Sequence, residues 1–117
     1  MNKELENKMG KIQLLEQNIQ NFSMQKQTFQ GQLLEAENAL KELDKSKGAM
    51  FKIVGNIMVS SDKESLKKDL ESKKEIYNLR IKSIAKQENS LKEKIKDLQE
   101  EILEEMKKRD KSVKKND

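Results

Sequence analysis

Residues 48–62, Gly48-Ala-Met-Phe-Lys-Ile-Val-Gly-Asn-Ile-Met-Val-Ser-Ser-Asp62, decide the fold of this 117-residue chain. Two apolar runs in the stretch flank the pair Gly55-Asn56. Glycine at the first turn position supplies the positive φ that a type II′ turn requires, and asparagine tolerates unusual φ angles. The stretch therefore predicts a β-hairpin over about residues 49–60, with Gly55 and Asn56 at its turn.

The sequence before the hairpin repeats every seven residues. Heptad positions a and d can be assigned without a break from Leu5 to Leu43, and ten of these twelve positions are apolar. A repeat of 3.5 residues sustained over this length is typical of a coiled-coil seam. We therefore expect a long helix over about residues 3–46. The twelve seam positions are Leu5, Lys8, Ile12, Leu15, Ile19, Phe22, Lys26, Phe29, Leu33, Ala36, Leu40 and Leu43.

A second heptad repeat follows the hairpin, and eight of its eleven a and d positions are apolar. The segment Ser61-Asp-Lys-Glu64 matches a capping box, in which a hydroxyl cap precedes Glu by three residues. The second helix is therefore expected over about residues 62–107, followed by a basic disordered tail over about 108–117. The eleven seam positions are Leu70, Lys74, Tyr77, Ile81, Ile84, Glu88, Leu91, Ile95, Leu98, Ile102 and Glu105.

Two seams joined by a short hairpin bury each other when the helices fold back antiparallel. Facing residues then have numbers that sum to roughly 110, given the heptad register. The predicted fold is therefore mainly α, with one domain over residues 1–117. It is a long antiparallel two-helix coiled coil whose helices are joined by a single β-hairpin.

The composition argues against enzyme chemistry. The chain has no His and no Cys, which are the commonest metal ligands, nucleophiles and proton shuttles. Its four glycines are isolated, so a glycine-rich phosphate loop is missing. We therefore expect no enzyme activity, no catalytic residue, no metal and no cofactor. A chain that is 39% charged and 33% apolar can also be disordered, but the strict periodicity favours long helices.

Membranes and nucleic acids are not expected partners. No apolar run approaches the length of a membrane span, and the residues after Met1 lack the apolar core of a signal peptide. We therefore expect a soluble, cytoplasmic protein. The formal net charge of +4 is carried by residues 107–117. That basic tail has no aromatic residue to stack on bases, and a solubilising role is the simpler interpretation.

Both faces of the predicted hairpin are largely apolar. A lone two-stranded hairpin is marginally stable and leaves two unpaired edges. We therefore expect the hairpin to join several chains through its sheet edges into a closed or extended sheet. The alternative is a hairpin folded back over the helices of its own chain. The predicted assembly residues are Phe51, Ile53, Val54, Gly55, Asn56, Ile57, Met58 and Val59.

At the opposite end of the coiled coil, where the two ends of the chain meet, four apolar residues lie off the seam. Methionine and leucine at a helix end can form an adaptable contact surface, because Met side chains re-pack around irregular partners. The alternative is ordinary scattered surface apolar residues, since Leu34 and Leu79 also face outward. The four predicted tip residues are Met9, Leu14, Leu103 and Met106.

The chain resembles the β-type subunit of prefoldin over about residues 5–107. The specific part of the resemblance is the hairpin with its flanking spacing, because any two coiled coils look alike. The matching segments are Ala49-Met-Phe-Lys-Ile-Val-Gly-Asn-Ile-Met-Val59, Gln25-Lys-Gln-Thr28, Ala39-Leu-Lys-Glu-Leu43, Leu79-Arg-Ile-Lys82 and Lys86-Gln-Glu88.

This resemblance implies a hexamer of two α and four β subunits, whose hairpins join into a β-barrel body from which the coiled coils extend. It also implies an ATP-independent holdase, a co-chaperone that binds unfolded proteins with its coiled-coil tips and transfers them to a group II chaperonin. The implied partners are a prefoldin α-type subunit, unfolded polypeptide clients and the chaperonin. The alternative function is a structural coiled-coil adaptor without holdase activity.

Overall fold

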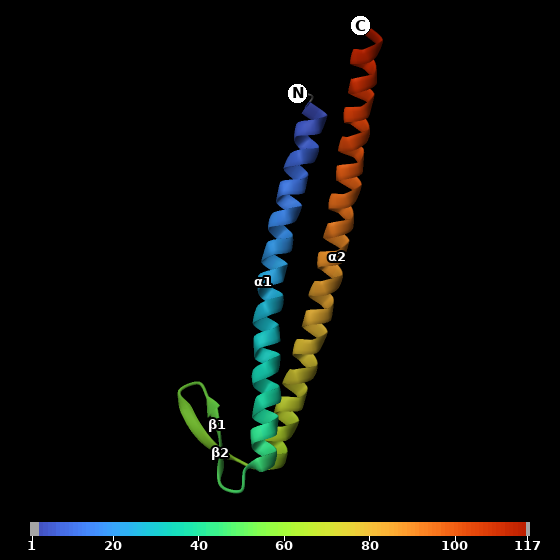
Figure 1. Ribbon diagram of the computed structural model, residues 1–117. Helices are drawn as coiled ribbons and strands as arrows, with labels where there is room; N and C mark the ends of the chain where they lie inside the picture. The colour runs from blue at the N-terminus through green and yellow to red at the C-terminus, as the bar shows by residue number, and fades with distance from the viewer. Residues whose placement is uncertain (1–2, 117) are drawn as a thin grey trace. The chain divides into compact units, whose positions relative to one another are not determined.

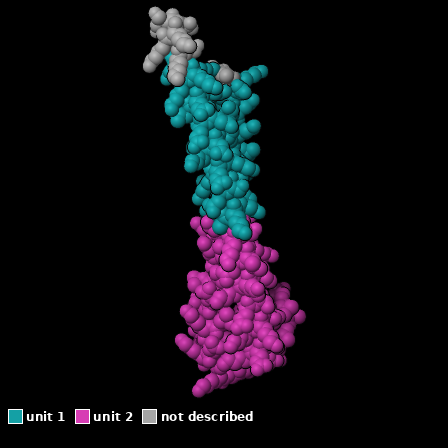
Figure 2. Space-filling view, turned by 90° about the vertical axis from the view of Figure 1, so that its right-hand side faces the viewer, with its two compact units in different colours: residues 1–24, 84–117 teal, residues 25–83 magenta. Residues whose placement is uncertain are grey.

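The computed structural model describes the backbone of residues 3–116 and the side chains of residues 3–110. The chain forms two helices, α1 (Lys3–Lys45) and α2 (Lys63–Asn116), with the strands β1 (Met50–Val54) and β2 (Ile57–Ser61) between them (Figure 1). It divides into two compact units (Figure 2). We call residues 25–83, which include the strands, the hairpin unit. Residues 1–24 together with 84–117 are the terminal unit.

The heptad register predicted from the sequence is confirmed by burial. Each of the 23 predicted a and d positions in the two helices is at least partly shielded from solvent. The remaining shielded helix residues lie at e or g positions, which border the seam. The most deeply buried apolar side chains are Leu5, Ala36, Leu43 and Ile84, all of them at a or d positions. The two helices therefore bury their seam side chains against each other.

Side-chain contacts within each unit confirm that the helices run antiparallel. In the terminal unit, Lys8 Nζ lies 3.6 Å from Glu101 Oε2 and 3.7 Å from Glu105 Oε1. In the hairpin unit, the rings of Phe29 and Tyr77 stack with their centroids 6.3 Å apart. The residue numbers in each pair sum to values close to 110, as the predicted register requires.

The hairpin has the predicted register and turn. β1 and β2 pair antiparallel, with Val54 opposite Ile57 and Phe51 opposite Ser60. Gly55 has a φ of 63°, and no other described residue has a positive φ. A type II′ turn requires a positive φ at its first central position alone, which is the position that Gly55 occupies. The Gly55-Asn56 pair therefore sets the turn as expected.

The residue that caps α2 differs from the one the sequence suggested. Asp62, and not Ser61, is the N-cap, because its Oδ1 accepts a 2.7 Å hydrogen bond from the Ser65 backbone N–H. The Asp62 carbonyl also accepts the first helical hydrogen bond, from the Leu66 N–H at 3.2 Å. The reason for the shift is that β2 extends through Ser61. One residue is then left between strand and helix to serve as the cap.

The end of α2 also differs from the prediction. The helix was expected to stop near residue 107, before a disordered tail over 108–117, yet its backbone continues to Asn116. Asp117 lies outside the described residues. Residues 103–116 contain no Gly or Pro, so nothing in the sequence interrupts the helix.

No helix in the described part of the chain is long and apolar enough to cross a membrane.

A leucine of the seam should contribute far more stability than a leucine outside it. Leu43→Ala is expected to lower the free energy of unfolding by about 2–5 kcal/mol, because it empties a buried position. Leu34→Ala is the matched control in the same helix, because the Leu34 side chain is 57% exposed against 8% for Leu43. Its cost should stay within about 0.5 kcal/mol. Denaturant unfolding followed by circular dichroism measures both, and equal losses would contradict the seam assignment.

The Asp62 cap should make stability depend on pH at the acid end. The hydrogen bond from the Ser65 backbone N–H lowers the pKa of Asp62 from its ordinary value of 3.8. A carboxylate with a lowered pKa in the folded state contributes stability above its unfolded pKa, and that contribution disappears as pH falls through the folded pKa.

Asp62→Asn keeps a capping oxygen but cannot titrate. The melting temperature of the wild type, relative to this variant, should therefore fall as pH decreases from 6 to 2. Asp62→Ala, which has no capping oxygen, should melt lower than both at pH 6. A wild-type-to-Asn difference that stays constant over this pH range would contradict the assignment.

Candidate functional site

The hairpin exposes most of its apolar side chains. Every residue from 51 to 60 is exposed, and the six large apolar side chains of the strands are between 45% and 71% accessible. These six belong to the residues predicted to build the assembly surface: Phe51, Ile53, Val54, Ile57, Met58 and Val59. An exposed, apolar two-stranded sheet is marginal in water and attracts other strands to its edges.

This exposure argues against one of the two arrangements that the sequence left open, the hairpin folded back over its own helices. In a hairpin folded over its own helices, one face would be buried against them. In the structure only Met50 and Ser61, at the strand ends next to the helices, are partly shielded. The helices of the hairpin unit have already buried the side chains at their a and d positions in their own seam. Nothing in the described part of the chain therefore covers the strands.

The two faces of the hairpin are not equivalent. The inner face, which includes Met50, Lys52 and Ser61, carries the partly shielded strand ends. The outer face carries Phe51, Ile53 and Met58 together with Ser60. We use these two names below for the two sets of alternating residues.

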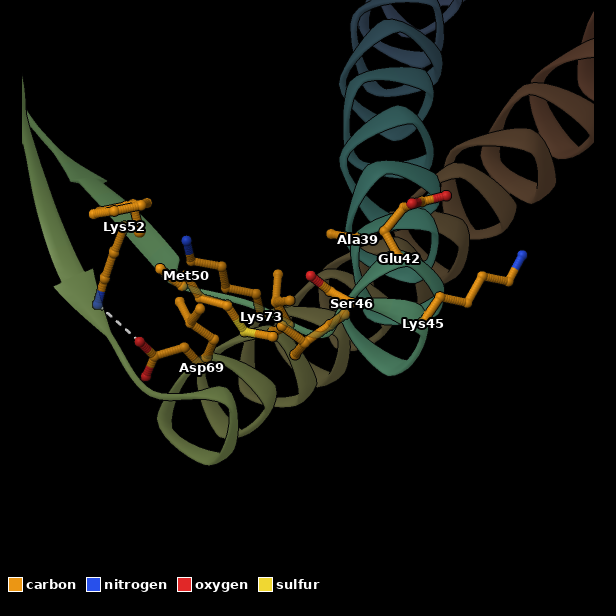
Figure 3. Close-up of a pocket in the computed structure, with 13 residues that line it drawn as sticks. Ala39, Glu42, Lys45, Ser46, Met50, Lys52, Asp69 and Lys73 are labelled. Atoms are coloured by element: carbon orange, nitrogen blue, oxygen red, sulfur yellow. Dashed lines mark hydrogen bonds and ion pairs between the residues drawn. The ribbon is translucent and has the colours of Figure 1, made fainter.

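A groove of about 520 Å³ lies in the hairpin unit between β1 and the adjoining helix ends (Figure 3). Apolar side chains of both helices line it, among them Leu43, Leu66 and Leu70. At its edge, Lys52 Nζ donates a 2.7 Å hydrogen bond to Asp69 Oδ2 on α2. That contact lowers the pKa of the Asp69 carboxyl from its ordinary value. The groove therefore has an apolar floor and an ion pair at its rim.

The four predicted tip residues lie in the terminal unit, on two different flanks of the coiled coil. Met9 and Met106 occupy e positions and Leu103 a b position, and in an antiparallel pair these positions share one flank. Leu14 occupies a c position, on the opposite flank. Leu14, Leu103 and Met106 are exposed, whereas Met9 is half-buried. The structure therefore groups three of the four residues, which we call the tip flank, and separates Leu14 from them.

Leu14 lines a second groove, of about 390 Å³, in the terminal unit. Leu15 and Leu98 of the seam line it together with Leu14, and four charged residues surround them. Sequence reasoning assigned Leu15 and Leu98 to the seam alone and so missed this groove. The heptad positions carried a signal for it, because every lining residue is at c, d or g. The charged lining residues are Lys11, Lys94, Asp97 and Glu101.

The terminal unit also contains ion pairs between the two helices. Lys8 and Glu105 occupy d positions of the seam, and Lys8 bridges Glu105 and Glu101 with both N–O distances below 4 Å. An ionic layer thus interrupts the apolar seam within one helical turn of the buried Leu5. Among the described side chains, no group of acidic residues converges as metal ligands would. The candidate sites are therefore apolar surfaces bordered by charge.

Exposed apolar residues also occur away from the tip flank. Met24, Leu34, Ile76 and Leu79 are all at least 45% accessible. Exposure alone therefore does not identify a binding surface. The hairpin differs from these positions because its apolar residues are contiguous and its backbone edges are unpaired.

Proteins with similar sequences are prefoldin subunits. The sequence model of the family described as prefoldin subunit matches residues 6–109. The prefoldin subunit beta of Sulfurisphaera tokodaii is 35% identical over 103 residues, which cover 86% of this chain and 82% of that protein. The prefoldin subunit beta of Archaeoglobus fulgidus is 35% identical over 101 residues, covering 85% of this chain and 87% of that protein.

Solved structures agree with the sequences. The crystal structure of the prefoldin beta subunit from Thermococcus strain KS-1 matches with a TM-score of 0.81 and 29% identity, covering 87% of this chain and 91% of that one. The prefoldin beta2 subunit from the same strain shares the fold, with a TM-score of 0.67 and 18% identity. The family match spans both helices and the hairpin between them. The resemblance predicted from the hairpin and its flanking heptads is thus confirmed, and the chain belongs to the prefoldin family.

Proposed function

We propose that this chain is a β-type subunit of a non-enzymatic holdase. It joins other prefoldin subunits through its hairpin and holds unfolded polypeptides at the ends of its two helices. The observation that carries the proposal is the hairpin itself. Its two faces are apolar and exposed on a chain whose helices have already buried their own seams.

Assembly follows from the two open edges of the hairpin. Each edge presents backbone groups that can pair with a strand of another chain, and a sheet loses all its edges only when it closes into a barrel. Membership of the prefoldin family supports assembly with other prefoldin subunits. We propose the family arrangement of two α and four β subunits, in which this chain supplies one hairpin to a barrel-like body.

Client holding is assigned to the terminal unit. Met106, Leu103 and the half-buried Met9 form a flank of flexible apolar side chains that can adapt to irregular partners. Holding an unfolded chain needs apolar area and no fixed catalytic geometry, so it requires neither ATP nor a cofactor. We propose that clients bind this flank in the cytoplasm and pass from there to a group II chaperonin.

The competing function is a structural adaptor that joins partner subunits without holding clients. The exposed apolar residues outside the tip flank, such as Leu34 and Leu79, favour this alternative, because they show that exposed leucines need not mark a client site. An adaptor and a holdase both require the hairpin. They differ in whether the tip flank is needed for activity.

The turn glycine should be essential for assembly. Gly55→Ala places a side chain at a φ of 63°, which L residues other than Asn and Asp rarely adopt. We expect the variant to assemble at least about fivefold more weakly, since the strain amounts to roughly 1–2 kcal/mol per residue. Native mass spectrometry across a concentration series, with a two-hairpin prefoldin α subunit present, measures the change.

Gly48→Ala is the control, because Gly48 has open space around the position of a Cβ and no positive φ. It should assemble like the wild type. If Gly55→Ala assembled as well as Gly48→Ala, the hairpin turn would not control assembly.

Removing the apolar side chains of the tip flank should weaken client holding without preventing assembly. The variant Met9→Ser, Leu103→Ser, Met106→Ser should need at least about tenfold more complex to suppress the aggregation of a protein diluted from denaturant. Tenfold in affinity corresponds to about 1.4 kcal/mol, which is roughly what the burial of one apolar side chain contributes. Light scattering measures the suppression, and native mass confirms that the complex forms.

The matched control is Met24→Ser, Leu34→Ser, Leu79→Ser, which removes one methionine and two leucines that are exposed elsewhere. It should hold clients normally. Equal suppression by the tip variant and the wild type would move the client site elsewhere. A wild-type complex that forms but suppresses no aggregation would favour the adaptor.

A further inference from the structure

Lys52 is the only charged residue in either strand of the hairpin. The other strand residues are large apolar residues or serine. A lysine at the centre of β1 places a charge in a surface that is otherwise suited to apolar packing. The contact that the Lys52 ammonium group makes therefore indicates the role of this residue.

That contact is the Asp69 carboxylate on α2, at 2.7 Å. No other side chain of residues 50–61 in the described chain forms a hydrogen bond or ion pair with a helix. Lys52 belongs to the inner face, the same face as the partly shielded Met50 and Ser61. In Figure 3 the Lys52 and Asp69 side chains reach toward each other from the hairpin and the helix.

The short connections between the hairpin and the helices suggest what this contact does. One residue, Asp62, connects β2 to α2, and four residues connect α1 to β1. A single-residue link allows the hairpin to change its tilt at Asp62 by backbone rotation. Asp69 lies seven residues further along α2, two helical turns from that link. A bond at this distance from the pivot resists rotation of the hairpin away from the helix.

We propose that the Lys52–Asp69 ion pair is an orienting latch, which fixes the tilt of the hairpin so that its outer face, with Phe51, Ile53 and Met58, is presented to the next subunit. The proposal rests on the proposed assembly through the hairpin and adds the residues that position it. Lys52 and Asp69 are positioning residues in this account. They act on assembly through the orientation of the hairpin.

The expected size of the effect follows from exposure. Both side chains of the pair are nearly half exposed, at 44% and 48%, so screening by water limits the strength of the bond. Pairs of this kind change an equilibrium by up to about fivefold. The apparent affinity between subunits falls in proportion to the fraction of hairpins that hold the competent tilt. Loss of the latch should therefore weaken assembly by about two- to fivefold.

Salt gives the latch a signature that an apolar interface lacks. Salt at about 1 M reduces the screening length to roughly 3 Å, which weakens an exposed ion pair. Apolar contacts are not weakened in this way. Assembly of the wild type should therefore become weaker between 0.1 and 1 M NaCl by the same two- to fivefold, whereas assembly of a latch-free variant should lose this dependence.

The test compares the concentration at which half of the subunits are assembled, measured by native mass spectrometry and sedimentation with a two-hairpin prefoldin α subunit. The variants are Asp69→Asn, Lys52→Gln, their combination, and the charge exchange Lys52→Asp with Asp69→Lys. Asp69→Asn is the cleanest, because Asp69 is outside the hairpin. Each single variant should weaken assembly two- to fivefold, the combination should be no worse than either, and the exchange should restore assembly.

Lys8→Gln is the matched control, since it removes a lysine from an ion pair with Glu101 and Glu105 in the terminal unit. It should assemble like the wild type and keep the salt dependence. Wild-type assembly together with unchanged assembly of Asp69→Asn would overturn the latch and leave the proposed function standing. Failure of the charge exchange to restore assembly would also overturn it. A wild-type chain that never assembles with its partner would overturn both the latch and the proposed function.

Discussion

Burial of the heptad side chains is the constraint on which the rest of the structure depends. The a and d residues of α1 and α2 shield one another, with Leu5, Ala36, Leu43 and Ile84 most deeply buried. The seam occupies the inward face of both helices, and the apolar helix residues outside it, such as Leu34 and Leu79, are themselves exposed. They do not cover the hairpin, because residues 51–60 are all exposed. The strands are therefore exposed because the helices bury their seam side chains against each other and not against the hairpin.

The contrast between a buried seam and exposed apolar surfaces suggests how a chain without His, Cys or a cofactor-binding motif can have a function. Its two resources are contiguous apolar surface and the charges that border it. At the hairpin, the apolar faces meet the ion pair of Lys52 with Asp69. In the terminal unit, the tip flank and the groove around Leu14 lie near the ionic layer of Lys8 and Glu105. We propose that in both places burial of apolar surface supplies affinity and charge fixes the geometry of the contact.

Much of the fold could be predicted because it is encoded locally. The Gly55-Asn56 pair specifies the turn and thereby the register, and heptad spacing specifies the seam. Features that depend on competition or on tertiary geometry could not be predicted. Asp62 and not Ser61 caps α2, because Ser61 is the last residue of β2. The end of α2 has no Gly or Pro that would predict where the helix stops. The tilt of the hairpin, which brings Lys52 to Asp69, is not encoded in any repeating sequence pattern. The separation of Leu14 from the tip flank was available from the heptad positions and was missed.

We propose that the hairpin is covered by other subunits, while the coiled coil is complete within one chain. Hydrogen–deuterium exchange of the full chain, alone and assembled with a two-hairpin prefoldin α subunit, tests this claim directly. We expect amides of residues 50–61 to exchange rapidly in the free chain and slowly in the complex, whereas amides near Ile84 and Leu43 should be protected in both. Hairpin amides that exchange equally fast in both states would contradict it.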